Sequence, residues 1–154
     1  MEINIQRKQE EKTGSDQSQS LIEKIRDKSV KAGTNIVLTN LNFIGNRHWL
    51  LPQSHPALEE LLQVMQQNPS LEIETQGHIC CLPGPDDGYD EDIHTRNLSV
   101  TRAKTIYDYL VKNNISPQRL SYKGFGHQHP LFADEEIEAH RLLNRRVEIK
   151  IIKK

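Results

Sequence analysis

Residues 54–77 read SHPALEELLQVMQQNPSLEIETQG, and this stretch holds a helix signal followed by a strand signal. Ser54 can cap the helix, and Pro56 suits its first turn. The apolar residues that follow recur at the spacing of one helix face, namely Leu58, Leu61, Leu62 and Met65. Over residues 71–76, apolar and polar side chains alternate, which is typical of a strand with one solvent-facing side. The segment therefore predicts a helix and then a strand.

Similar patterns on either side predict further elements. We expect strands near residues 35–43, 71–77, 119–125 and 146–152, and helices near 55–67, 97–112 and 134–142. The third helix should open with the acidic residues 134–136, since the positive end of a helix dipole favours negative charge. Strands and helices alternate in βαβαβαβ order, with too few helices to cover both faces of a sheet. The expected fold class is α/β, an α+β two-layer sandwich in which a mixed sheet of about four strands carries helices on one face.

The chain has 154 residues, the usual size of one domain with an arm. Residues 10–20 contain no apolar side chain, and a weak helical pattern then ends near Gly33. We therefore divide the chain into a polar N-terminal arm or linker, 1–33, and a domain, 34–154.

Composition argues against several classes of function. Lys and Arg number 20 and Asp and Glu 21, a net charge of −1, so no basic face for nucleic acid is expected. No run approaches the roughly 18 consecutive apolar residues of a membrane-spanning helix. No nucleophile stands in a recognisable arrangement with a base, so we expect neither an enzyme nor a cofactor. The oligomeric state is left open.

Five short motifs follow one another along the chain: Phe43 with Leu50, Pro52 and Ser54; Gly77-His78; residues 98–103, LSVTRA; Gly124-Phe125-Gly126 with Pro130; and residues 144–147, NRRV. In this order they resemble the OmpA-like C-terminal domain. That family is the peptidoglycan-binding module of outer-membrane proteins, Pal lipoproteins and flagellar stators. The resemblance covers about residues 34–152.

The resemblance implies non-covalent binding of the peptidoglycan stem peptide through its diaminopimelate end. That end is zwitterionic, so it needs a cation for its carboxylate and an anion for its ammonium group. Arg102 matches the family's ligand-binding arginine, and its planar guanidinium can hold a carboxylate with two hydrogen bonds. Arg145 is a second candidate, because one arginine of NRRV could reach the pocket while the other pairs with an acidic helix.

The anionic half of the pair departs from the family pattern. Cys80, Thr95 and Ile44 stand where the family has the ammonium-binding aspartate, an asparagine and a further aspartate. The loop from Cys80 to Arg102 is several residues longer than usual, and its insertion is acidic. We expect a replacement anion from this insertion to approach Arg102, the candidates being Asp86, Asp87, Asp90 and Asp92. Alternatively, these carboxylates neutralise Arg102 and close the pocket.

The adjacent residues Cys80 and Cys81 admit three interpretations. They are two small buried side chains, a vicinal disulfide, or part of a metal site with His78 and either His94 or an aspartate. The spacing lacks the two-residue gap of common structural zinc ligands, so no metal is assigned. The Gly-His-x-Cys-Cys form resembles a variant among OmpA-like proteins of Bacteroidota.

Two classes of function follow from the resemblance. The first is a binding module that anchors an outer-membrane or periplasmic protein to the cell wall. The second is a protein-interaction or structural domain on the same fold, with an altered pocket.

The family implies a periplasmic, outer-membrane-associated setting, yet residues 1–8 lack the apolar segment of a secretory signal. We therefore expect either the C-terminal part of a longer exported protein or a longer precursor.

Overall fold

The computed structural model describes residues 19–81 and 86–154. The chain divides into two compact units, Met1–Val30 and Lys31–Lys154. The first unit contains helix α2, Leu21–Arg26, which begins with a capping box. The Ser20 hydroxyl accepts a hydrogen bond from the N–H of Glu23, and the Glu23 carboxylate accepts one from the N–H of Ser20. Most of the polar stretch at residues 10–20 lies outside the described residues.

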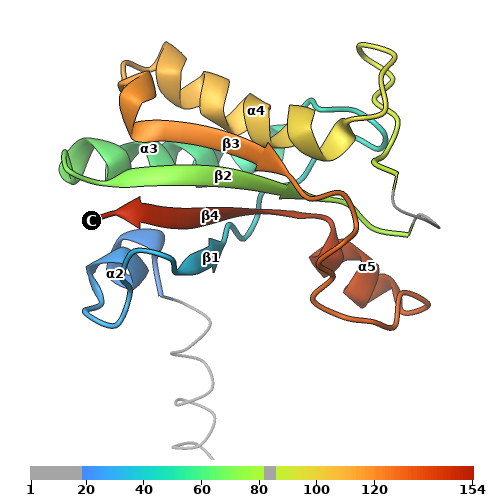
Figure 1. Ribbon diagram of the computed structural model, residues 1–154, viewed down its shortest axis with the longest axis horizontal. Helices are drawn as coiled ribbons and strands as arrows, with labels where there is room; N and C mark the ends of the chain where they lie inside the picture. Colours follow the sequence, from blue (N-terminus) through green and yellow to red (C-terminus); the bar gives the residue numbers. More distant parts are fainter. Residues whose placement is uncertain (1–18, 82–85) are drawn as a thin grey trace, which may run out of the picture. The chain divides into compact units, whose positions relative to one another are not determined.

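The second unit is built on a four-stranded sheet with the strand order β1-β4-β2-β3. The strands are β1 (Asn35–Val37), β2 (Glu72–His78), β3 (Leu120–Gly124) and β4 (Arg146–Lys153). β2 and β3 run parallel, whereas β4 is antiparallel to both of its neighbours, β1 and β2. The sheet is therefore mixed, and the last strand of the chain lies inside it (Figure 1).

Two long helices cover the apolar face of this sheet. Helix α3 (His55–Gln67) follows the short 3-10 turn η1 (Pro52–Ser54), and helix α4 (Leu98–Lys112) precedes a second such turn, η2 (Pro117–Arg119). The core combines almost fully buried side chains of the strands and both helices: Ile73, Ile149, Ile151, Leu58, Leu61, Val64, Met65, Ala103, Ile106 and Leu110. The fold class predicted from the sequence is confirmed, including the βαβαβαβ order.

Two predicted elements are shorter than expected. The strand predicted at 35–43 ends at Val37, and Asn40 adopts a φ of 60°, so extended backbone does not continue through this residue to Phe43. Phe43 pairs only in an isolated bridge. The helix predicted at 134–142 is α5, Glu138–Asn144. Asp134 instead accepts a hydrogen bond from the N–H of Glu136 in a turn, so the acidic segment precedes the helix rather than opening it.

Two glycines bring α4 close to the ends of β2 and β3. Gly77 and Gly124 are paired across these parallel strands. A Cβ on Gly77 would lie 1.9 Å from the carbonyl oxygen of Ser99, and one on Gly124 would lie 2.4 Å from Ser99 Oγ. Only glycine leaves room for this contact. The first turns of α4 are thereby held beside the segment that leaves β2 at His78.

The opposite face of the sheet holds a buried polar cluster. Nε and Nη2 of Arg146 lie 2.7 and 2.6 Å from Oε2 of Glu148. Nε2 of His78 lies 3.2 Å from the same oxygen without hydrogen-bond geometry, and its ring stacks on Phe125. Burial, together with the charge of Arg146, lowers the pKa of His78 to about 3. His78 is therefore neutral at physiological pH.

Candidate functional site

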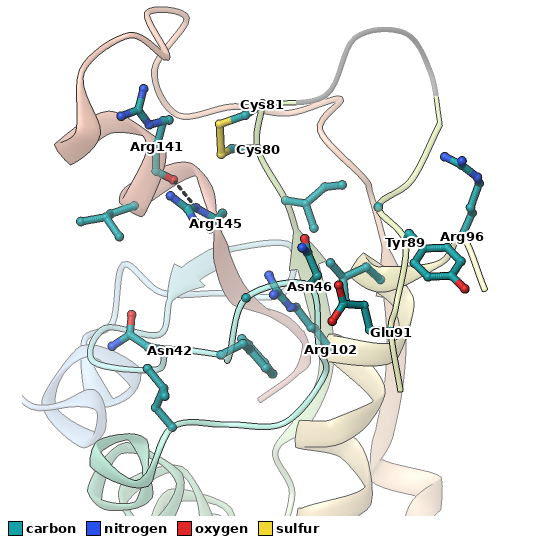
Figure 2. Close-up of a pocket in the computed structure, with 17 residues that line it drawn as sticks. Asn42, Asn46, Cys80, Cys81, Tyr89, Glu91, Arg96, Arg102, Arg141 and Arg145 are labelled. Atoms are coloured by element: carbon teal, nitrogen blue, oxygen red, sulfur yellow. Dashed lines mark hydrogen bonds between the residues drawn. A yellow bond between two sulfur atoms is a disulfide. The ribbon is translucent and has the colours of Figure 1, made fainter. Parts of the chain in front are cut away.

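A cavity of about 740 Å³ lies where β2 ends. Its walls come from the segment between β1 and α3, the segment before α4, α4 itself and α5 (Figure 2). The charged side chains that line it are Arg96, Arg102, Arg141, Arg145 and Glu91. Because it is concave and combines apolar walls with a few converging charges, it is the candidate ligand site.

Arg102 is held in place by backbone groups rather than by an acid. Its Nε donates to the carbonyl oxygen of Arg47 at 3.0 Å, and its Nη2 donates to that of Ile44 at 3.2 Å. The guanidinium carbon lies 4.9 Å from the ring centre of Phe43, a cation–π contact. Burial, followed by the charge of Arg145, lowers the pKa of Arg102 to about 10. The side chain is therefore still a cation at neutral pH, positioned at the cavity wall.

Asp87 and Asp90 are bound by polar groups at the start of α4. Asp87 accepts hydrogen bonds from the N–H and Oγ of Ser99 at 3.0 and 2.6 Å. The Asp90 carboxylate is buried, accepts a hydrogen bond from Thr101 Oγ1 at 2.7 Å and lies 2.8 Å from His48 Nδ1. Burial opposes the ionisation of Asp90, but these hydrogen bonds lower its pKa below the ordinary value. Both aspartates therefore fix the loop to α4.

Asp92 and Asp86 complete the set of proposed replacement anions. Asp92 accepts a hydrogen bond from Nη1 of Arg47 at 3.1 Å, and Asp86 is exposed. Within residues 19–81 and 86–154, no carboxylate forms an ion pair with Arg102, although the charges of Asp90 and Asp87 raise its pKa from a greater distance. Among the described residues, the guanidinium of Arg102 therefore has no carboxylate in direct contact with it.

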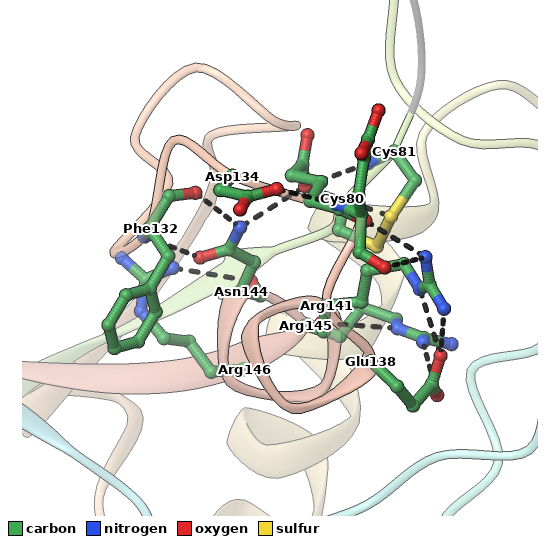
Figure 3. The surroundings of a disulfide bond; sticks show 11 residues. Cys80, Cys81, Phe132, Asp134, Glu138, Arg141, Asn144, Arg145 and Arg146 are labelled. Carbon is green, nitrogen blue, oxygen red and sulfur yellow. Dashed lines mark hydrogen bonds and ion pairs between the residues drawn. A yellow bond between two sulfur atoms is a disulfide. The ribbon is translucent and has the colours of Figure 1, made fainter.

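Cys80 and Cys81 form a vicinal disulfide, the second of the three interpretations. Both residues line the cavity. Figure 3 shows the pair beside α5, where one carboxylate oxygen of Glu135 accepts hydrogen bonds from the N–H of Cys81 at 3.2 Å and from Nδ2 of Asn144 at 3.1 Å. A disulfide carries no charge. Cys80 and Cys81 therefore contribute an uncharged sulfur surface to the cavity wall.

The remaining predicted site residues lie in different surroundings. Arg145 lines the cavity, with its Nη2 3.6 Å from a carboxylate oxygen of Glu138. Arg146 points instead into the polar cluster on the other face of the sheet. Thr95 is exposed, is not among the residues lining the cavity, and donates from Oγ1 to Oδ1 of Asn97. The structure thus brings Arg102, Arg145 and Cys80 together and leaves Thr95 outside.

Three charged residues of the cavity were not singled out from the sequence. Arg141 lies on α5, whose sequence carries no motif before NRRV, and Arg96 precedes LSVTRA by two residues. Glu91 belongs to the acidic insertion, but its place among four aspartates gave no reason to prefer it. The available signal for all three was proximity to a motif, which does not indicate where a side chain points.

The hydroxyl of Ser99 connects two loops at the start of α4. It donates to Asp87 and accepts a hydrogen bond from the N–H of Gly126 at 2.9 Å. Ser99 therefore links the acidic loop to the turn after β3, and it is the Asp87 carboxylate that accepts a hydrogen bond from the N–H of Ser99 at the start of the helix.

Residues 42–143 match the model of the OmpA family. Outer membrane porin F of Pseudomonas fluorescens is 33% identical over 100 residues, which are 65% of this chain and 28% of the porin. The chain spans less than half the length of the curated relatives it matches.

Two solved structures share the fold. The periplasmic domain of Helicobacter pylori MotB has a TM-score of 0.62 and 18% identity, covering 78% of this chain and 74% of that one. The cell wall anchor of the type VI secretion system (T6SS) of Pseudomonas aeruginosa has a TM-score of 0.59 and 22% identity, covering 78% of this chain and 80% of the anchor.

Proposed function

The chain belongs to the OmpA family, and from this premise we propose that it binds peptidoglycan non-covalently, through the diaminopimelate end of the stem peptide. In this role it would anchor an outer-membrane or periplasmic protein to the cell wall. The observation that carries the proposal is Arg102, a cation at the wall of a cavity, to which no acid of the described residues is bound. No catalytic step is part of this function.

The environment of Arg102 suits a ligand carboxylate. A guanidinium has five N–H donors, of which two are bound here by backbone carbonyl oxygens. These two bonds fix the plane of the group and leave other donors for a carboxylate. Arg145 adds a second positive charge on the same cavity. Because Arg102 is buried, its attraction to a bound anion is screened less by solvent than that of a surface arginine.

The domain boundaries and the setting are part of the proposal. We assign residues 34–154 to the OmpA-like domain and 1–33 to an arm or linker. Within the described residues, no helix is long and apolar enough to span a bilayer. The relatives include an outer membrane porin and a periplasmic domain, which supports a periplasmic, outer-membrane-associated location for this protein.

We also propose that Gly-His-x-Cys-Cys marks a Bacteroidota-type subfamily, which a survey of OmpA-like sequences carrying both cysteines would test.

Co-sedimentation with purified, protein-free peptidoglycan sacculi tests the binding. The wild-type domain should pellet with sacculi, and Arg102→Ala should lose most of this binding. Arg102→Lys should bind weakly, because an ammonium cannot reproduce the planar fork. Lys112→Ala is the matched control, since it removes a positive charge from the far end of the same helix. Circular dichroism verifies that each variant is folded.

The second candidate function is a protein-interaction or structural domain with an altered pocket. It is favoured by one observation, the neutral disulfide at the position of the ammonium-binding aspartate. If the folded wild-type domain fails to sediment with sacculi from several bacterial sources, this second function replaces the first. Sedimentation that is unchanged in Arg102→Ala would place the binding surface elsewhere on the domain.

A further inference from the structure

Positively charged side chains outnumber negatively charged ones among the described residues that line the cavity. Four arginines line it, and Glu91 is the only acidic residue among its described lining residues. A zwitterionic amino-acid end brings an ammonium group as well as a carboxylate, and an ammonium group placed among arginines needs an anion beside it. Glu91 is therefore the first residue to consider for that role.

The aspartates of the same loop have structural partners instead. Asp87 is bound by Ser99, Asp90 by Thr101, and Asp92 by a side-chain nitrogen of Arg47. None of the three is among the residues that line the cavity. Moving any of them to a ligand would break a hydrogen bond that fixes the loop to its neighbours.

Glu91 differs from these aspartates in what its carboxylate contacts. Its nearest cation is Nε of Arg47 at 3.8 Å, and both of these side chains are about half exposed. Such an exposed ion pair contributes little stability, and the carboxylate of Glu91 can readily exchange Arg47 for another cation. The carboxylate is therefore available to a ligand without loss of a strong bond inside the protein.

The backbone places Glu91 on the same support as Arg102. The N–H of Glu91 donates to the carbonyl oxygen of Asn46 at 2.9 Å. The carbonyl oxygens of the neighbouring residues Ile44 and Arg47 bind the guanidinium of Arg102. In the view of Figure 2, Glu91, Asn46 and Arg102 appear near one another among the residues that line the cavity. A single turn, residues 44–47, thus fixes both an anion and a cation at the cavity.

We propose that Glu91 binds the ammonium group of the zwitterionic ligand whose carboxylate is held by Arg102. The inference rests on the proposed function and adds the residue that sets specificity for a free amino group. The anion then comes from the loop before α4 and not from the segment after β2, where Cys80 is part of the disulfide. A half-exposed glutamate can follow the ligand, because its long side chain has several accessible rotamers.

Calorimetry with two synthetic ligands tests this assignment. The first is the stem tripeptide L-Ala-γ-D-Glu-meso-diaminopimelate, and the second is the same peptide with the free amino group of its diaminopimelate residue acetylated. Wild type should bind the first at least about tenfold more tightly than the second. Glu91→Gln should lose this preference by weakening binding of the free-amine peptide, while leaving the acetylated one nearly unchanged. Asp86→Asn, which changes an exposed carboxylate outside the cavity lining, should behave like wild type.

Each other outcome has a definite meaning. If Glu91→Gln prefers the free-amine peptide as strongly as wild type, another group binds the ammonium and the inference is wrong. If wild type binds both peptides equally well, the amino group is not recognised and the inference also fails, while peptidoglycan binding through Arg102 stands. If wild type binds neither peptide nor sacculi, the proposed function itself is wrong.

Discussion

The carboxylate of Asp87 accepts hydrogen bonds from both the N–H and the hydroxyl of Ser99 at the first turn of α4. Asn97, the residue that directly precedes the helix, makes no side-chain capping bond. Asp87 therefore supplies the cap from the acidic loop, ten residues earlier in the chain than Asn97. The same contact joins the loop that carries Glu91 to the helix that carries Arg102, and both line the cavity.

Removing this cap should lower stability. Asp87→Ala is expected to reduce the free energy of unfolding by about 1–2 kcal/mol, since it leaves an N–H and a hydroxyl at the helix start without their partner. Urea unfolding followed by circular dichroism measures the change. The neighbouring variant Asp86→Ala is the control and should stay within about 0.5 kcal/mol of wild type. Equal stability of the two variants would show that Asp87 does not cap α4.

The close contact between Gly77 and Ser99 leads to a sharper stability prediction. A methyl group at Gly77 would overlap the backbone of α4, so Gly77→Ala should cost about 3 kcal/mol or leave the domain unfolded. Gly45→Ala is a matched control, because a Cβ there meets nothing within 4 Å and the backbone does not need glycine. It should be neutral or slightly stabilising. Thermal unfolding that ranks the two variants in the reverse order would refute the proposed contact.

His78 should make stability depend on pH in the acidic range. Its pKa is about 3 in the folded protein and about 6.5 in an unfolded chain, so the unfolded state binds more protons between these values. The free energy of unfolding should therefore fall as the pH falls from about 6.5 toward 3, by up to about 1.4 kcal/mol per pH unit.

His78→Gln removes this titration while retaining Glu148, Arg146 and His129, the charged or titratable groups that face it. The free energy of unfolding of this variant should consequently change less between pH 7 and pH 4 than that of wild type. Urea unfolding at both pH values makes the comparison. Equal changes in the two proteins would mean that the pKa of His78 is not lowered in the folded protein.

The disulfide predicts the reactivity of both cysteines. Without reductant, neither Cys80 nor Cys81 should react with maleimide under denaturing conditions, and intact mass should be lower by two hydrogen atoms than that of the reduced chain. After treatment with a phosphine reductant, two labels should be incorporated. Labelling of both residues in protein purified from an oxidising compartment without reductant would show that they are free thiols.

The sequence allowed the main strands and helices to be predicted because their patterns are long. The stripe from Leu58 to Met65 and the alternation from Ile73 to Gln76 each extend over several residues, and the helix at 55–67 agrees with α3 in both bounds. The first strand was overextended, since nothing in its apolar pattern shows that Asn40 takes a left-handed conformation.

The site was less predictable than the fold. Motif positions led to Arg102, Arg145 and Cys80, which all line the cavity. They could not separate Glu91 from the aspartates around it, because that distinction depends on hydrogen bonds with Ser99, Thr101 and Arg47, residues distant in the chain or on another element. Loops of this kind are arranged by tertiary contacts, and local sequence carries little of that information.

The most direct test of ligand binding at the cavity is an NMR titration of the isotope-labelled domain with the soluble stem tripeptide. This titration reports both whether and where the ligand binds. We predict saturable shifts of the backbone amides of Asn46, Cys81, Glu91 and Arg102, with little change at Lys112 at the far end of α4. The same titration of Arg102→Ala should show no saturable shifts. A wild-type spectrum that does not change, or that changes only at residues away from the cavity, would contradict the claim that this pocket binds the cell wall.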